Sequence, residues 1–192
     1  MYLPMIAVAA MTGLLASRLN TRVLVVAGLL LAALSFGRTE VWSSEESLWA
    51  EAVRRSPEKI RPKIQLARAV GPRRALPLLE DARSAAPFDP LVASELGSTY
   101  MALGNPAAAL AEFGRALALQ PGNAGAMNNR GAALLALGQR DAARADFERA
   151  LRNDPCLFDA RFNLRRLGVF SAVPPGCRYT PEQNKLLQWN PL

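Results

Sequence analysis

Residues 90–123 read PLVASELGSTYMALGNPAAALAEFGRALALQPGN, and residues 124–157 read AGAMNNRGAALLALGQRDAARADFERALRNDPCL. Both stretches are 34 residues long and space their small and large apolar residues alike. Prolines mark nearly the same period earlier in the chain, at intervals of 30, 34 and 34 residues: Pro57, Pro87, Pro121 and Pro155. Such a period is typical of helical hairpins that stack and bury a continuous core between neighbours.

Each stretch predicts two helices with a tight turn between them. Gly104 and Gly138 follow the first helix of each pair, where a positive φ is commonly needed. Small residues are expected where the two helices of a hairpin come close: Gly97, Gly131, Ala109, Ala143, Ala116 and Ala150. Large apolar residues are expected to fill the gaps between hairpins: Trp49, Tyr100, Phe113, Leu134 and Phe147.

The same positions resemble the tetratricopeptide repeat family. In residues 90–123 the matching positions are Leu96-Gly97, Tyr100, Leu103-Gly104, Ala109, Phe113, Ala116-Leu117 and Pro121. In residues 124–157 they are Gly131, Leu134, Leu137-Gly138, Ala143, Phe147, Ala150-Leu151 and Pro155. The resemblance implies an all-α fold, a short α-solenoid of about three helical hairpins plus half-repeats.

The pattern weakens at both ends of a solenoid expected over residues 43–168. Residues 60–89 resemble a degenerate repeat that is shorter by four residues near Gly71, and residues 45–55 resemble a second helix alone. Residues 158–168 predict a cap helix, with Arg161, Arg165 and Arg166 on its polar outer face. In the tail, 169–192, Thr180-Pro181-Glu182-Gln183 predicts a capping box that opens a short helix ending at Gln188.

The beginning of the chain differs sharply in composition from the rest. Residues 1–17 and 23–37 are apolar runs, and only Arg18 and Arg22 carry charge among the first 37 positions. We expect a transmembrane helical hairpin over residues 1–42, while two buried helices of a soluble protein are the alternative. Basic connectors favour the cytoplasmic side, which predicts a bacterial inner-membrane protein with its repeats in the periplasm.

This region also resembles the last membrane helices and repeat entry of polytopic membrane glycosyltransferases with C-terminal tetratricopeptide repeats. The residues concerned are Tyr2-Leu3-Pro4, Thr39, Trp42, Glu45, Leu48-Trp49, Val53 and Ser56-Pro57. The catalytic acidic residues of that family lie in early loops with no counterpart in this sequence, so no catalytic residue carries over. The resemblance implies either the C-terminal part of such an enzyme or a separate accessory subunit. A cytochrome c biogenesis factor is a third possibility, because such factors also join two helices to periplasmic repeats.

The composition argues against catalysis by this sequence alone. It contains no histidine and only two cysteines, and it has no Gly-rich phosphate loop or nucleophile elbow. We therefore expect no enzyme activity, no cofactor, no metal and no small-molecule substrate. Nucleic acid is also a poor partner, because the basic residues are not interleaved with aromatic ones.

Three groups of residues are candidates for interaction. Gln65, Glu95, Asn129 and Asn163 occupy the inner-face position of successive first helices, where they could hold a peptide backbone or be merely structural. Arg54, Arg55, Arg73 and Arg74 are candidates for contact with anionic lipids or an acidic partner, against a solvated surface. Cys156 and Cys177 either form a disulfide or remain free thiols. Together these features predict a membrane-anchored adaptor that binds protein partners in a larger membrane complex.

Overall fold

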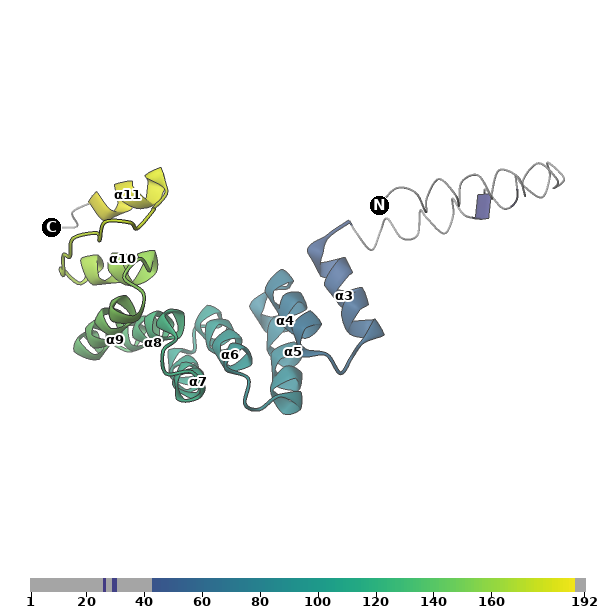
Figure 1. The fold of residues 1–192 in the computed structure, drawn as a ribbon. Helices are drawn as coiled ribbons and strands as arrows, with labels where there is room; N and C mark the ends of the chain where they lie inside the picture. Colours follow the sequence, from purple (N-terminus) through teal and green to yellow (C-terminus); the bar gives the residue numbers. More distant parts are fainter. Residues whose placement is uncertain (1–25, 27–28, 31–42, 189–192) are drawn as a thin grey trace. The chain divides into compact units, whose positions relative to one another are not determined.

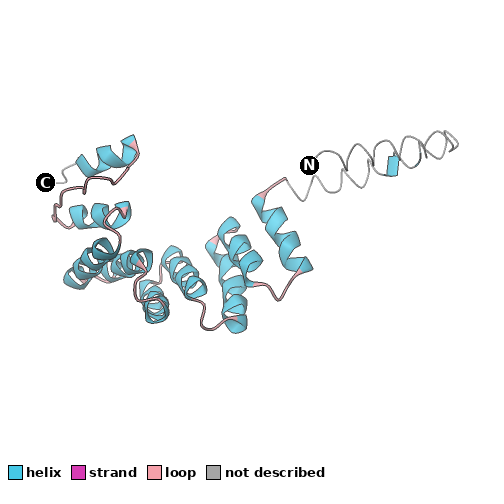
Figure 2. Cartoon of the chain, viewed as in Figure 1, coloured by secondary structure: helices cyan, strands magenta, loops and turns pink. Residues whose placement is uncertain are grey.

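The computed structural model describes residues 26, 29–30 and 43–188, and between residues 43 and 188 its regular structure is entirely helical (Figures 1 and 2). The helices are α3 (Glu45–Arg55), α4 (Ile60–Ala69), α5 (Pro72–Ala85), α6 (Pro90–Ala102), α7 (Pro106–Leu119), α8 (Ala124–Ala136), α9 (Arg140–Asn153), α10 (Phe158–Arg166) and α11 (Pro181–Gln188). Among the described residues, no helix is long and apolar enough to cross a membrane. The predicted transmembrane hairpin lies outside them, apart from residues 26, 29 and 30.

The chain divides into two compact units, Met1–Glu51 and Ala52–Leu192, with the boundary inside α3. Helix α3 buries no residue completely, and Trp49 keeps part of its surface exposed. Phe113 and Phe147, which were predicted alongside it as stacking residues, are fully buried. Trp49 is therefore not a core residue of the same kind.

Helices α4 to α9 form three successive hairpins, and each helix packs on the next one along the chain (Figure 1). The first helices also contact one another from repeat to repeat, α6 with α8 and α8 with α10. These first helices therefore line one face of the stack. The predicted all-α solenoid is confirmed.

The two helices of each regular hairpin cross where a glycine meets a phenylalanine ring. A Cβ atom placed on Gly97 would lie 2.6 Å from Cε1 of Phe113, and one on Gly131 would lie 2.6 Å from Cε1 of Phe147. Both rings are almost entirely buried, at 1% and 0% exposure. Since only glycine leaves room for the ring, the predicted close approach of the helices is confirmed.

Turns and caps also follow the sequence. Gly104 and Gly138 have φ angles of 74° and 77° and are the middle residues of the turns after α6 and α8. The side chains of Asp89, Asn105 and Asn123 accept hydrogen bonds from backbone N–H groups in the first turns of α6, α7 and α8. These local bonds fix where each helix begins.

The first hairpin, α4–α5, departs from this pattern. Helix α4 has 10 residues where α6 has 13, and only Val70 and Gly71 separate α4 from α5. Neither α4 nor α5 has a side-chain cap. The missing four residues thus shorten both the first helix and the turn, and Ala67 and Leu79 share one core cluster in this hairpin.

The end of the stack corrects one prediction. Arg161 was expected on the outer face of the cap helix α10, but it is 5% exposed. Its guanidinium donates to Ser171 Oγ at 2.7 Å, to the carbonyls of Ala172 at 2.8 Å and Pro155 at 2.7 Å, and to the Tyr179 hydroxyl at 3.2 Å. A buried guanidinium needs such partners. Arg161 therefore holds the tail against α10.

Two further features fix the tail. Cys156 and Cys177 form a disulfide across 21 residues. The backbone N–H of Thr180 donates to Gln183 Oε1 at 2.9 Å, and the N–H of Gln183 donates to Thr180 Oγ1 at 3.2 Å, so the predicted capping box opens α11. Helix α11 then packs on α10.

Candidate functional site

One predicted residue lies on each of the four first helices. Gln65 lies on α4, Glu95 on α6, Asn129 on α8 and Asn163 on α10, and all four side chains are half-buried. Position 95 is separated from 129, and 129 from 163, by the 34-residue period. We call the face lined by the first helices the first-helix face.

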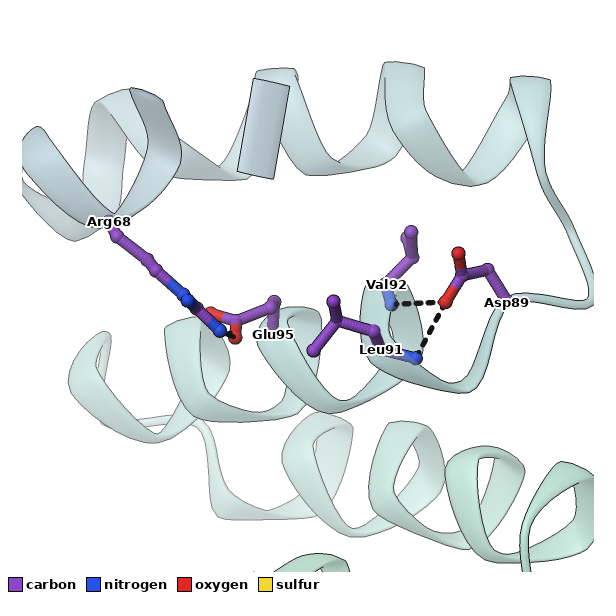
Figure 3. Close-up of polar contacts among 5 residues, drawn as sticks. All are labelled: Arg68, Asp89, Leu91, Val92 and Glu95. Atoms are coloured by element: carbon purple, nitrogen blue, oxygen red, sulfur yellow. Dashed lines mark hydrogen bonds and ion pairs between the residues drawn. The ribbon is translucent and has the colours of Figure 1, made fainter. Parts of the chain in front are cut away.

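On the first-helix face, an ion pair between Arg68 and Glu95 joins α4 to α6 (Figure 3). Arg68 Nε donates to Glu95 Oε1 at 3.0 Å, and a terminal guanidinium nitrogen contacts the same oxygen. The hydrogen bond to Glu95 raises the pKa of Arg68 despite partial desolvation. Asp89 accepts hydrogen bonds from Leu91 and Val92 in the same view and fixes the start of α6. Glu95 thus links two repeats. The sequence analysis did not predict this role, because nothing in the sequence pattern indicated that Arg68 pairs with Glu95.

The α8 and α10 part of the face is a chain of amides. Asn163 Nδ2 donates to Asn128 Oδ1 at 3.0 Å, and Asn128 Nδ2 donates to Asn129 Oδ1 at 3.2 Å. Asn128 is 6% exposed and joins the two predicted asparagines. The sequence analysis did not select Asn128, although the pair Asn128-Asn129 stands out in a helix whose other residues, apart from Arg130, are small or apolar. We call these three residues the amide chain.

The amide chain leaves one hydrogen-bond donor at one end and one acceptor at the other. In the hydrogen bonds between described residues, Asn129 Nδ2 donates to no acceptor and Asn163 Oδ1 accepts from no donor. An amide offers one acceptor oxygen and two donor hydrogens. One donor and one acceptor on the same partly exposed face match the C=O and N–H of a peptide backbone.

The predicted basic residues fall into two pairs with different settings. Arg54 and Arg55 occupy the last turn of α3, where cations interact favourably with the helix dipole. Arg73 and Arg74 occupy the first turn of α5, where the same dipole disfavours them. Both pairs are exposed. The second pair lines an open cavity of about 540 Å³ beside the shortened turn, with Gly71, Pro72, Ala102 and Leu103.

Two further ion pairs, each with one buried partner, join the two helices of a hairpin. Arg130 Nε donates to Asp146 Oδ2, and its terminal nitrogen to Oδ1, both at 2.7 Å. The hydrogen bond to Asp146 raises the pKa of Arg130. Lys63 Nζ lies 2.6 Å from Asp81 Oδ2 in the first hairpin. These charges link the two helices of one hairpin, which makes them structural. Within the described part of the chain, no group of three or more histidine, cysteine or acidic side chains could hold a metal ion.

A family model described as tetratricopeptide repeat matches residues 94–156. Residues 94–156 therefore form tetratricopeptide repeats. The match covers α7, α8 and α9 completely and most of α6, and these helices form the two hairpins with the glycine-phenylalanine crossing. No curated protein matches the chain.

Solved structures show the same fold. MamA is 18% identical with a TM-score of 0.56, over 73% of this chain and 81% of that one. YrrB, a tetratricopeptide repeat protein with an unusual peptide-binding site, is 22% identical with a TM-score of 0.54, over 62% and 66%. A thermophilic tetratricopeptide repeat protein of Thermus thermophilus is 24% identical with a TM-score of 0.53, over 59% and 66%. At these identities the likeness extends to the fold of the repeats.

Proposed function

We propose that this tetratricopeptide repeat protein is a non-enzymatic adaptor whose first-helix face binds an extended peptide segment of a partner protein. The observation that carries the proposal is the amide chain, with one donor and one acceptor left at its two ends. Such groups pair with the backbone of any peptide, while neighbouring side chains supply the selectivity. The absence of histidine from the sequence supports a non-catalytic role.

The proposal also places the adaptor in a membrane complex. The apolar runs 1–17 and 23–37 support an anchor of two helices, and the basic residues between them support repeats on the periplasmic side of a bacterial inner membrane. Two membrane helices resist extraction by alkaline carbonate. If the chain is released into the carbonate wash while integral proteins stay in the pellet, the anchor is wrong.

The disulfide offers a separate test of the compartment. Disulfides persist in oxidising compartments and are rare in the cytosol. Alkylation of the unreduced protein isolated from its own cells should leave the intact mass unchanged, because Cys156 and Cys177 are the only cysteines. Two added alkyl groups would contradict the periplasmic placement.

A second candidate function follows from the resemblance of residues 1–57. The chain is then the C-terminal part of a membrane glycosyltransferase whose catalytic part lies upstream or on another chain. Tyr2-Leu3-Pro4 at the start of an apolar run, followed by Trp42 and Ser56-Pro57 before the repeats, favours this interpretation. Sequencing of the transcript upstream of Met1 tests this candidate: a longer reading frame that encodes further membrane helices would decide for the enzyme.

Peptide binding is tested with a displayed library of random twelve-residue peptides, selected on the purified full chain held through an N-terminal tag. The selected peptides are then synthesised and their dissociation constants measured. Asn129→Ala and Asn163→Ala should each weaken binding by about three- to tenfold, the effect of one hydrogen bond. Gln139→Ala is the matched control, because Gln139 is an exposed amide that makes no capping bond. Equal affinities in all variants would overturn the proposed face.

A further inference from the structure

An apolar cavity lies between the cap helix and the tail helix. Its volume is about 550 Å³, and it is lined by Phe162 of α10 and by Glu182, Lys185 and Leu186 of α11. The three α11 residues are spaced as i, i+3 and i+4, so they form one stripe of that helix. Leu186 remains 44% exposed in the cavity wall.

The cavity continues the first-helix face. Ser94, Asn128 and Phe162 occupy equivalent positions of α6, α8 and α10, each separated from the next by 34 residues. Phe162 also directly precedes Asn163, whose amide nitrogen bonds Asn128. The aromatic ring therefore stands where the row of small and amide side chains ends.

The wall on the α11 side is held in place before any ligand arrives. Leu187 is 8% exposed on the buried side of α11, and the ring of Tyr179 lies edge-on to Phe158 with centroids 5.7 Å apart. Phe158 in turn stacks on Phe162 at 5.8 Å. With the disulfide and the Arg161 bonds, these contacts fix the wall, and a fixed cavity saves the binding energy that ordering it would cost.

We propose that this cavity takes one large apolar side chain of a peptide whose backbone lies along the amide chain. The proposal rests on the peptide-binding function above and names its specificity. The volume lies in the range of pockets that bury a drug-sized ligand, so it has room for one large aromatic or aliphatic side chain together with adjoining backbone, but not for a second domain. The rim charges, one from Glu182 and one from Lys185, cancel, and the amides carry no charge. The complementary segment is therefore neutral around its apolar anchor.

The experiment uses a peptide from the random library selected on the full chain and a matched peptide in which its largest apolar residue is serine. Burial of a leucine-sized side chain gives a factor of about ten to one hundred in affinity. The full chain should therefore bind the anchored peptide at least tenfold more tightly. Leu186→Ser and Phe162→Ala should remove that preference and leave the serine peptide unaffected. Leu186 is exposed, so its variant tests the cavity without disturbing the core. Leu137→Ser, at the exposed end of the turn after α8, is the control.

Each outcome separates this inference from the function on which it rests. Peptides that depend on Asn129 and Asn163 but show no apolar preference would overturn the cavity and keep the peptide-binding face. If no peptide depends on the asparagines, both fail. A concentration-dependent dimer abolished by Leu186→Ser would assign the cavity to a second copy. A tenfold gain in peptide affinity on removal of residues 189–192 would assign it to the chain's own end. Either result would overturn the proposal.

Discussion

The helix crossing of the first hairpin, α4–α5, uses a different pair of residues from those of the next two, α6–α7 and α8–α9. In the later hairpins a glycine admits a phenylalanine ring, Gly97 with Phe113 and Gly131 with Phe147. In the first hairpin Ala67 and Leu79 occupy the corresponding positions, and both are buried. A larger residue on one helix is thus matched by a smaller one on its partner. The crossing conserves volume, as close-packed interiors require.

The hairpins also differ in what fixes their ends. The later ones have glycines with positive φ in their turns, and three of their four helices, α6, α7 and α8, have an Asp or Asn cap. The first hairpin has an extended Gly71 at φ −66° and no side-chain cap. The family model begins at residue 94, after the first hairpin. The family model therefore matches the hairpins that have the glycine-phenylalanine crossing and the positive-φ turn. The first hairpin has neither feature and still stacks in the same fold.

The largest expected effect is truncation of a crossing ring. Phe113→Ala should lower the free energy of unfolding by about 3–5 kcal/mol, because it empties a buried site at the crossing of α6 and α7 that also borders Ala133 of α8. Leu79→Ala in the first hairpin should cost about 2–5 kcal/mol by the same mechanism. Urea unfolding followed by circular dichroism measures both. An unchanged midpoint for Phe113→Ala would show that the ring is not part of the core.

The volume match is tested by placing the residue pair of the first hairpin, alanine and leucine, at the crossing of the second hairpin. Gly97→Ala should destabilise by about 1–3 kcal/mol through the clash with Phe113, less the gain of about 1 kcal/mol in helix propensity. Combined with Phe113→Leu, it recreates the pair Ala67 and Leu79. The double variant should lose at least about 0.5 kcal/mol less than the sum of the single losses. Simple additivity would mean that the two positions do not share volume.

The turns give a smaller contrast. Gly138→Ala should cost roughly 1–2 kcal/mol, because an L-residue is strained at its φ of 77°. Gly71→Ala should change stability by less than about 0.5 kcal/mol, since no atom lies within 4 Å of the new Cβ. The reduced freedom of the unfolded chain is offset there by the poor capping preference of alanine. Equal losses at both positions in thermal unfolding would contradict this distinction.

The smallest effect concerns the contact that joins the first hairpin to the second. Burial, and then the neighbouring Glu80 carboxylate, raises the pKa of Tyr100, whose hydroxyl donates to Glu80 Oε1 at 3.3 Å. The folded chain thus holds this proton more tightly than the unfolded chain. Stability should fall as the pH rises above 10, the ordinary value, and through the folded pKa. The fall should be smaller in Tyr100→Phe, as measured by urea unfolding between about pH 9 and pH 11. An identical fall in both proteins would show that Tyr100 does not contribute to the pH dependence of stability.

Features that depend on neighbours in sequence could be predicted, and features that depend on distant partners could not. Gly104, Gly138 and the Thr180–Gln183 capping box were predictable because their geometry is set within four residues. The prediction for Arg161 was wrong because its partners at Ser171, Ala172 and Tyr179 come from a tail that folds back without any periodic pattern.

The candidate site shows the same division. The 34-residue period predicted Asn129 and Asn163 on one face, and in the structure hydrogen bonds through Asn128 connect them. It did not indicate that Asn128 joins them, or that Glu95 is taken by Arg68, because side-chain pairing across 27 and 35 residues depends on how neighbouring first helices face each other.

Nuclear magnetic resonance of the asparagine side chains tests most directly whether the first-helix face binds the peptide. The full chain labelled with nitrogen-15 on asparagine is titrated with a library-selected peptide, and the side-chain amide resonances are followed by nuclear magnetic resonance. We predict that the amide signals of Asn129 and Asn163 shift most and saturate with the dissociation constant of the peptide, whereas the amide of Asn105 at the start of α7 stays in place. Saturating binding that leaves Asn129 and Asn163 unshifted would contradict the central claim that the first-helix face holds the peptide.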